Sequence, residues 1–164
     1  MFKLFSKKAA VEELVAPMSG KVVQIEDVPD EVFSQKMIGD GIAIEPDEGV
    51  VVSPVDGEIV QFFPTKHAVG LKTKSGLEIL IHIGMETVAL NGEGFEGFVQ
   101  QGDRVKAGDK LVSFDLEQIR ERAESIISPV VITNFDAVDT LTKTTETSVK
   151  RGESVLLTVK MKQL

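Results

Sequence analysis

Short apolar runs, each soon closed by glycine, proline, aspartate or serine, recur along the chain between Val15 and Lys162. Runs of this length and spacing are typical of strands joined by tight turns rather than of ordinary helices. They indicate an all-β, mostly antiparallel fold, either a sandwich or a barrel. The predicted strands are Lys21–Ile25, Gly41–Ile44, Val50–Ser53, Glu58–Phe63, Ala68–Thr73, Glu78–Ile83, Lys110–Phe114, Val130–Thr133 and Ser154–Val159.

One or two short helices are expected within this pattern. Asp115 followed by Gln118 has the spacing of an N-terminal helix cap, and the segment Leu116–Ser125 is rich in helix formers. Val28–Gln35, which contains Pro29, is predicted to form a turn or a small helix.

Two short motifs each occur twice. P-M-S-G-K-V-V-Q at Pro17–Gln24 is matched by P-V-D-G-E-I-V-Q at Pro54–Gln61, and V-K-A-G-D-K-L-V at Val105–Val112 is matched by V-K-R-G-E-S-V-L at Val149–Leu156. In each copy a glycine supplies the turn geometry from which a strand can begin. The repeats favour a β fold with internal pseudo-symmetry, and they are too short for a solenoid.

Composition narrows the class of protein. The chain has 164 residues, and we expect a flexible N-terminal segment at residues 1–10 and a single β domain at residues 11–164. A net charge of −8 argues against nucleic acid as a partner, because phosphate binding needs clustered lysine and arginine. The absence of cysteine excludes disulfides and thiolate chemistry and fits a cytoplasmic location. No apolar run has the length that crosses a bilayer.

The first eight residues, M-F-K-L-F-S-K-K, are apolar and basic but lack the features of a signal peptide. We favour a frayed tail. The alternative is a weak contact with an anionic membrane surface through Phe2, Leu4, Phe5 and the lysines.

The chain has only two histidines, His67 and His82, and both fall in one predicted hairpin. With a two-residue loop at Ser75-Gly76, His67 lies diagonal to His82 on one face, with Cα atoms about 7–8 Å apart. A three-residue loop shifts the register by one residue and is expected to send the histidines to opposite faces. That second register pairs the isoleucines before His82 with better apolar partners, so periodicity leaves both registers open.

Two adjacent imidazoles can carry out phosphoryl transfer. One imidazole nitrogen can attack phosphorus and hold the group as a phosphoramidate, while the other ring donates a hydrogen bond to the phosphoryl oxygens. The nucleophile must be neutral at the attacking nitrogen, so its other nitrogen should donate to a fixed acceptor. Gly84, two residues after His82, would let the backbone curl back to supply one.

The segment G-L-E-I-L-I-H-I-G-M-E-T-V around His82 resembles the phosphohistidine motif of the glucose-family IIA proteins of the bacterial phosphoenolpyruvate-dependent sugar phosphotransferase system. The resemblance extends over nearly the whole chain. Its other motifs, in order, are A-P-M-S-G, E-D-V-P-D-E-V-F-S-Q-K-M-I-G-D-G-I-A-I, P-V-D-G-E-I, F-P-T-K-H-A, G-E-G-F, F-D-L and P-V-V-I-T-N.

The resemblance implies a phosphocarrier. His82 would accept a phosphoryl group on Nε2 from the phosphocarrier protein HPr and pass it to the IIB domain of a sugar permease. His67 would support the phosphoryl group and its onward transfer, and Thr65 would hydrogen-bond to this pair. No organic cofactor or metal ion is implied. Members of the family also act as regulators that bind other proteins.

The resemblance also implies a partner-binding surface around the histidines, made of apolar and acidic side chains. Glu86 departs from the family pattern, in which familiar members carry aspartate; the charge is kept but its reach changes. The apolar positions are Val32, Phe33, Met37, Ile38, Phe63, Leu80 and Val88, and the acidic ones are Asp30, Glu86 and Asp136.

The residues also suggest two other functions. A-P-M-S-G-K-V-V and V-K-A-G-D-K-L-V resemble the half-motifs of biotinyl and lipoyl carrier domains, but the lysine that such domains present on a hairpin has no counterpart here. A zinc-binding module could use His67 and His82, yet two ligands are too few for a tight site. Adventitious zinc at the histidine pair is the more plausible form of that alternative.

Overall fold

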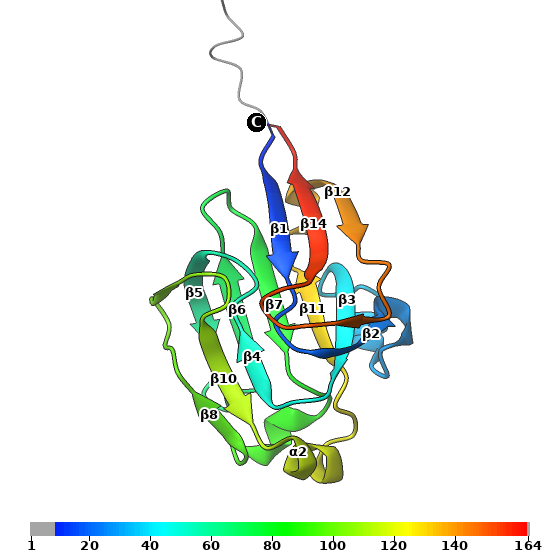
Figure 1. The fold of residues 1–164 in the computed structure, drawn as a ribbon, viewed down its shortest axis with the longest axis vertical. Helices are drawn as coiled ribbons and strands as arrows, with labels where there is room; N and C mark the ends of the chain where they lie inside the picture. The colour runs from blue at the N-terminus through cyan, green and yellow to red at the C-terminus, as the bar shows by residue number, and fades with distance from the viewer. Residues whose placement is uncertain (1–8, 164) are drawn as a thin grey trace, which may run out of the picture.

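The structure is a computed structural model and describes residues 9–163. Its strands form three antiparallel sheets (Figure 1), which confirms the predicted all-β class. One three-stranded sheet has the order β1 (Val11–Val15), β14 (Val155–Met161), β12 (Val138–Lys143), and the other has the order β4 (Val50–Val52), β10 (Lys110–Phe114), β8 (Phe95–Gly97). The eight-stranded sheet has the order β13 (Ser148–Val149), β2 (Gly20–Gln24), β3 (Asp40–Pro46), β11 (Ser128–Ile132), β7 (Glu78–His82), β6 (Ala68–Lys72), β5 (Gly57–Phe62), β9 (Arg104–Val105).

All the predicted strands are present, with ends that differ from the prediction by at most two residues. The strands that the sequence did not predict, β1, β8, β9, β12 and β13, all lie at the edge of a sheet. An edge strand is defined by the neighbour with which it pairs rather than by its own apolar content, and in β12 only the first residue, Val138, is buried. The hydrophobic pattern that reveals central strands is therefore weak in these five.

The predicted helices are also present. Asp115 caps α2 (Leu116–Arg122), because its carboxylate accepts the backbone N–H of Gln118 at 3.1 Å. The helix ends before the predicted Ser125, since the carbonyl of Ser125 instead accepts the N–H of Met85. The segment after Pro29 forms α1 (Glu31–Ser34), which is capped by Asp30. Among residues 9–163 the structure also has the 3-10 helices η2 (Ile25–Asp27), η3 (Thr87–Leu90) and η4 (Phe135–Ala137).

The repeated motifs form equivalent parts of the sheet, which confirms the expected pseudo-symmetry. Read from its two edges, the eight-stranded sheet runs β13-β2-β3-β11 on one side and β9-β5-β6-β7 on the other. The first motif forms β2 in one half and β5 in the other, and each copy of the second motif begins at the last residue of the edge strand that pairs with it, β13 or β9. The two halves meet where Ile81 of β7 pairs with Val130 of β11.

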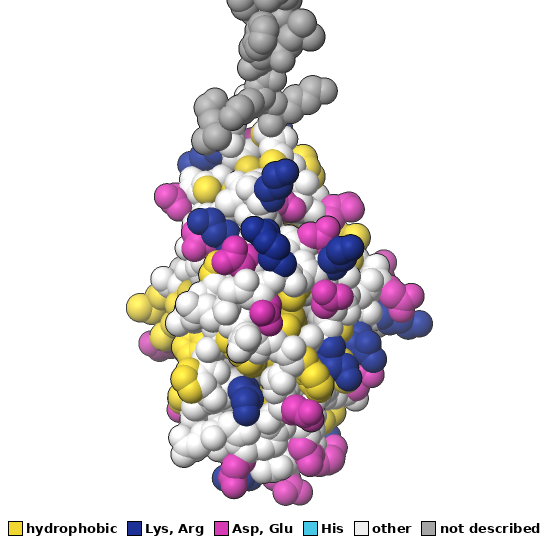
Figure 2. Space-filling view, turned by 90° about the vertical axis from the view of Figure 1, so that its left-hand side faces the viewer, with side chains coloured by type: hydrophobic (Ala, Val, Ile, Leu, Met, Phe, Trp, Pro, Cys, Tyr) yellow, Lys and Arg dark blue, Asp and Glu magenta, His cyan; other side chains and the backbone are white. Residues whose placement is uncertain are grey.

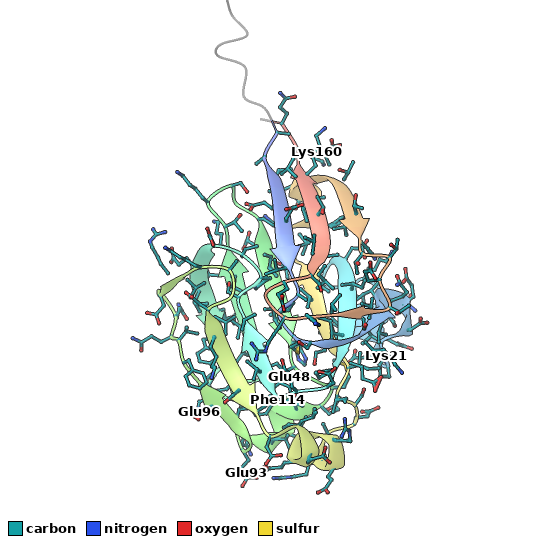
Figure 3. The ribbon with its side chains drawn as sticks, in the orientation of Figure 1. Lys21, Glu48, Glu93, Glu96, Phe114 and Lys160 are labelled. Atoms are coloured by element: carbon teal, nitrogen blue, oxygen red, sulfur yellow. The ribbon has the colours of Figure 1, made fainter. Side chains whose placement is uncertain are left out.

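Two apolar clusters hold these layers together. The larger one lies between the sheets and includes the ring pair of Phe114 (labelled in Figure 3) and Phe95, with centroids 6.2 Å apart. The smaller one anchors the segment that carries η2 and α1 and contains Ile25, Val28, Phe33, Ala43, Met85 and Val131. It fixes α1 beside the end of β7, where His82 lies.

The N-terminal segment expected to fray or to touch a membrane, residues 1–8, lies outside the described residues. In the part of the chain that the structure covers, no helix has the length and apolarity that would let it cross a membrane. The face shown in Figure 2 carries charged side chains of both signs, with no histidine visible on it.

Candidate functional site

The hairpin of β6 and β7 has the three-residue loop. Thr73 donates its N–H to the carbonyl of Leu77 at 2.9 Å, and Gly76 adopts a left-handed φ of 96° within the loop. The register that matches the apolar residues is therefore the one formed. It sets Ala68 opposite His82.

The expectation that this register separates the two histidines is wrong. The rings of His67 and His82 lie edge to face, with centroids 5.0 Å apart and planes at 81°. The alternation of side chains applies only within the strand, which begins at Ala68. His67 belongs to the preceding turn, in which Lys66 has a left-handed φ of 59°. The turn, rather than the pleat of the sheet, therefore directs the His67 ring toward His82.

His82 is held in a defined orientation at the end of β7. Its Nδ1 lies 2.8 Å from the carbonyl oxygen of Gly84. A carbonyl can only accept, so Nδ1 carries the proton and the neutral ring keeps its lone pair on Nε2. Gly84 has a left-handed φ of 68°, and a Cβ there would lie 2.8 Å from Cγ2 of Thr87 and 2.9 Å from the carbonyl oxygen of Ser125. Glycine is needed for this backbone conformation and for the space.

His67 is the more deeply buried of the pair, with 4% of its surface exposed. Its Nδ1 lies 2.5 Å from the hydroxyl oxygen of Thr65, and the ring of Phe63 packs against it with centroids 5.2 Å apart. The structure therefore brings Thr65, predicted from the resemblance, into contact with the histidine pair.

Both histidines are held neutral at physiological pH. Burial, the larger cause, and the neighbouring His82 together lower the pKa of His67 from 6.5 to about 4. Burial also lowers the pKa of His82, although the carbonyl of Gly84 and the negative charges of Asp30 and Glu86 act in the opposite direction. A neutral His82 is the form whose Nε2 can act as a nucleophile.

Sequence reasoning missed Ser128, a fully buried residue that fixes the backbone at Gly84. The N–H of Gly84 donates to the Ser128 hydroxyl at 3.0 Å, and that hydroxyl donates to the carbonyl of Ile126 at 2.9 Å. A continuous chain of hydrogen bonds therefore runs from Ile126 through Ser128 and Gly84 to His82. The available signal was a single serine before Pro129 within an otherwise apolar segment.

Two of the predicted partner-binding side chains, Phe33 and Phe63, contact the histidine pair. The ring of Phe33 packs on His82 with centroids 5.2 Å apart, and Leu80 is two residues earlier on the same face of β7. Three of the predicted apolar side chains are exposed to solvent, Val32 at 39%, Met37 at 71% and Val88 at 51%, which leaves their apolar surface available to a partner. We call these seven residues, Val32, Phe33, Met37, Ile38, Phe63, Leu80 and Val88, the apolar rim.

The acidic residues fall into two groups. Asp30 and Glu86 are near enough to His82 to affect its pKa. Glu86 has a left-handed φ of 61°, unusual for a residue with a side chain, and precedes η3 in the loop that follows His82. Asp136 lies in η4, which follows the last residues of β11. Those residues pair with the start of β7, whereas His82 is the last residue of β7. The structure does not bring Asp136 to the histidines.

The zinc alternative requires further ligands beside the histidine pair. Within residues 9–163, no group of three or more histidine, cysteine, aspartate or glutamate side chains is arranged to hold a metal ion. The two imidazoles alone leave a tetrahedral zinc short of ligands.

Comparison with known proteins agrees with this geometry. Residues 12–138 match the model of the family described as phosphoenolpyruvate-dependent sugar phosphotransferase system, EIIA 1. A protein of Bacillus cereus named PTS system glucose-specific EIIA component is 57% identical over 162 residues, which cover 98% of each chain. A protein of Halalkalibacterium halodurans with the same name is 58% identical over 92% of this chain and 87% of its own.

A solved structure is also similar. Glucose permease IIA from Mycoplasma capricolum superposes with a TM-score of 0.85 at 45% identity, covering 90% of this chain and 96% of that one. These matches give no support to a biotinyl or lipoyl carrier or to a zinc-binding module. The chain belongs to the EIIA 1 family of the phosphoenolpyruvate-dependent sugar phosphotransferase system.

Proposed function

We propose that His82 is the residue that carries the phosphoryl group in this protein. EIIA components of this system accept that group from HPr and transfer it to a IIB domain during sugar uptake, and so does this chain. The observation that carries the assignment is the hydrogen bond from Nδ1 of His82 to Gly84, because it leaves the lone pair on Nε2.

In the proposed transfer, Nε2 of His82 attacks phosphorus as the bond from phosphorus to the histidine of HPr breaks. The His82 ring gains positive charge as the new nitrogen–phosphorus bond forms. The carbonyl of Gly84 and the carboxylates of Asp30 and Glu86 stabilise that charge, consistent with their effect on the pKa of His82. No proton has to move in this step, so placement and electrostatics supply most of the catalysis.

His67 is proposed to stabilise the transferred group. With the Thr65 hydroxyl donating to Nδ1 of His67, the proton of the neutral His67 ring lies on Nε2. That N–H can donate to a phosphoryl oxygen on the neighbouring ring. The two histidines thus take opposite tautomers, one exposing a lone pair and the other a donor.

The apolar rim is proposed as the shared docking surface for HPr and the IIB domain. Both partners must reach the same histidine, so they must bind the same area in turn. Asp30 and Glu86 add negative charge at its border, suited to basic residues of a donor. Phosphorylation adds about −1.5 to −2 charge within this apolar area, which disfavours renewed docking of the charged donor.

Further assignments rest on the relatives or on the sequence. The relatives named glucose-specific support glucose as the sugar taken up by the partner permease. We also propose that residues 11–164 form one IIA-type domain and that the protein works in the cytoplasm. Binding of regulatory targets and weak membrane contact through the N-terminal segment remain predictions.

The test uses phosphoenolpyruvate, the general phosphotransferase enzyme, HPr and a IIB domain, with mass analysis of the EIIA chain. The unmodified protein should gain one acid-labile phosphoryl group, and His82→Ala should gain none. His67→Ala should still accept the group but deliver it poorly to IIB. Urea unfolding of each variant controls for loss of the fold. If both variants behaved like the parent protein, the site assignment would be wrong.

A further inference from the structure

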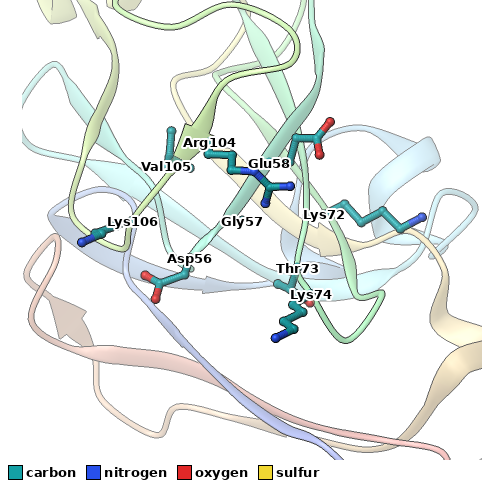
Figure 4. Close-up of a pocket in the computed structure, with 9 residues that line it drawn as sticks. All are labelled: Asp56, Gly57, Glu58, Lys72, Thr73, Lys74, Arg104, Val105 and Lys106. Carbon is teal, nitrogen blue, oxygen red and sulfur yellow. The ribbon is translucent and has the colours of Figure 1, made fainter.

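The pseudo-symmetry of the fold builds one kind of hollow twice, at the two outer edges of the eight-stranded sheet. The first, which we call the basic hollow, has a volume of about 780 Å³ and lies where β5, β9 and the loop after β6 meet (Figure 4). The second, the twin hollow, has a volume of about 450 Å³ and lies beside β13 and the ends of β2 and β3. The charged residues of the basic hollow are Asp56, Glu58, Lys72, Lys74, Arg104 and Lys106.

The strand register sets the equivalence of the two hollows. Lys72 pairs with Glu58 in the ladder of β5 and β6, and Glu45 pairs with Lys21 in the ladder of β2 and β3. The same registers give the counterpart of each cation in the other half of the sheet. Lys72 corresponds to Glu45, Lys74 to Asp47, and Arg104 to Ser148.

The comparison shows that the fold does not require cations at these positions. The same scaffold accommodates two acids and a serine in the other half of the molecule. In the twin hollow the cation Arg151 has partners within the hollow. Its side chain forms an ion pair with Glu48, and its backbone N–H donates to the hydroxyl of Ser19. The sheet therefore forms without a positive charge at three of the four cation positions, whereas the counterpart of Lys106 is Lys150 of the twin hollow.

The cations of the basic hollow are also unpaired. Among residues 9–163, none of Lys72, Lys74, Arg104 and Lys106 has a carboxylate within ion-pair distance. One of the two acids in the hollow is already engaged, since Asp56 accepts the N–H of Ala107 at 2.9 Å. In a chain of net charge −8, these four cations against the two acids Asp56 and Glu58 leave the basic hollow with an excess of positive charge.

We propose that the basic hollow binds a small anion that carries a phosphate group. Figure 4 shows Arg104 reaching over the strand that holds Gly57 and Glu58, with the three lysines around it. A guanidinium can bind two phosphate oxygens at once, and the lysines supply further positive charge on long, adaptable side chains. The phosphate could belong to a soluble metabolite or to a lipid headgroup, because both present the same chemistry.

This site is separate from the histidine pair. Ala68 at the start of β6 is opposite His82, whereas Lys72 is the last residue of that strand and faces the other end of β7. Binding in the basic hollow therefore leaves His82 accessible and does not depend on the proposed transfer step. The function inferred here goes beyond phosphoryl relay.

The test measures binding to the full chain at constant ionic strength by ¹H–¹⁵N NMR, with pyrophosphate and inorganic phosphate as soluble probes. Vesicles containing phosphatidylglycerol, tested by sedimentation, are the lipid probe. Lys72→Gln/Arg104→Ser removes two positive charges from the basic hollow. Lys21→Gln/Lys150→Gln, on the side of the twin hollow, removes the same net charge and serves as the matched control.

Saturable shifts of the Gly57, Thr73 and Val105 amides are expected with a soluble probe. Its affinity should fall about tenfold in Lys72→Gln/Arg104→Ser and stay within about twofold in the control. Vesicle binding lost only in the first variant, without soluble binding, would identify a lipid headgroup as the source. The absence of saturable binding to every probe, or equal weakening in both variants, would overturn the proposal. Phosphorylation of His82 should be unchanged in both.

Discussion

Replacing Ser128 by alanine tests whether a hydrogen bond remote from phosphorus sets the tautomer of His82. The substitution removes the acceptor of the Gly84 N–H and the donor to the carbonyl of Ile126, both in the protein interior. A buried polar group left without a partner costs about 1–3 kcal/mol. Because two groups are affected, we expect the free energy of unfolding to fall by about 2–4 kcal/mol.

The same change should slow phosphorylation of His82. Without the Ser128 hydroxyl, the N–H of Gly84 loses its anchor, so Gly84 can shift and its carbonyl holds Nδ1 of His82 less precisely. Small displacements of a reacting group carry large rate costs, so we expect the rate constant for transfer from phospho-HPr to fall about tenfold. The ¹⁵N shifts of the His82 ring should show more of the tautomer protonated on Nε2.

Ser53 provides a matched control. It is also fully buried, and its hydroxyl donates to the carbonyl of Val55 at 2.6 Å, in a part of the fold unconnected to the histidines. Ser53→Ala should lower stability by about 1–3 kcal/mol in urea unfolding and leave the transfer rate unchanged. Wild-type rate and tautomer in Ser128→Ala would refute the reasoning, as would equal slowing in Ser53→Ala.

Three further outcomes are expected. Gly84→Ala should lower the free energy of unfolding in urea by about 2–4 kcal/mol, because it adds a steric clash to the strain of a left-handed backbone. Gly76→Ala has the same strain but open space around its Cβ, so it should lower that free energy by only about 1–2 kcal/mol. Equal losses in the two variants would count against the clash. The pKa of His67 is about 4 in the folded protein and ordinarily 6.5, so the unfolded chain binds a proton first as the pH falls. The free energy of unfolding, measured in urea, should therefore drop between about pH 6.5 and pH 4. His67→Gln should make this drop smaller, and an unchanged pH dependence would contradict the prediction. Met37→Ser should leave stability within about 0.5 kcal/mol, because Met37 is 71% exposed, while the KM for phospho-HPr in transfer assays rises; an unchanged KM would remove Met37 from the apolar rim.

Several features of the fold follow from local sequence pattern. The central strands carry enough β-branched and apolar residues to be recognised alone, and Asp115 marks the start of α2 because capping is a local interaction. The repeated motifs indicate the pseudo-symmetry, because similar sequences build similar strands. The edge strands escape prediction because the hydrogen bonds that define them come from residues far away in the chain.

The amino-acid sequence alone establishes the β class, the family resemblance and the two residues able to carry a phosphoryl group, because those depend on residue chemistry and local pattern. Only the folded chain shows that the histidines are in contact. They are so in the register for which the alternation of side chains predicted opposite faces. The deciding features lie outside the alternation of the strands: the turn at Lys66 directs His67 toward His82, and Ser128, far away in the chain, fixes the backbone at Gly84. For the same reason Asp136, near the site by resemblance, lies at the other end of the sheet.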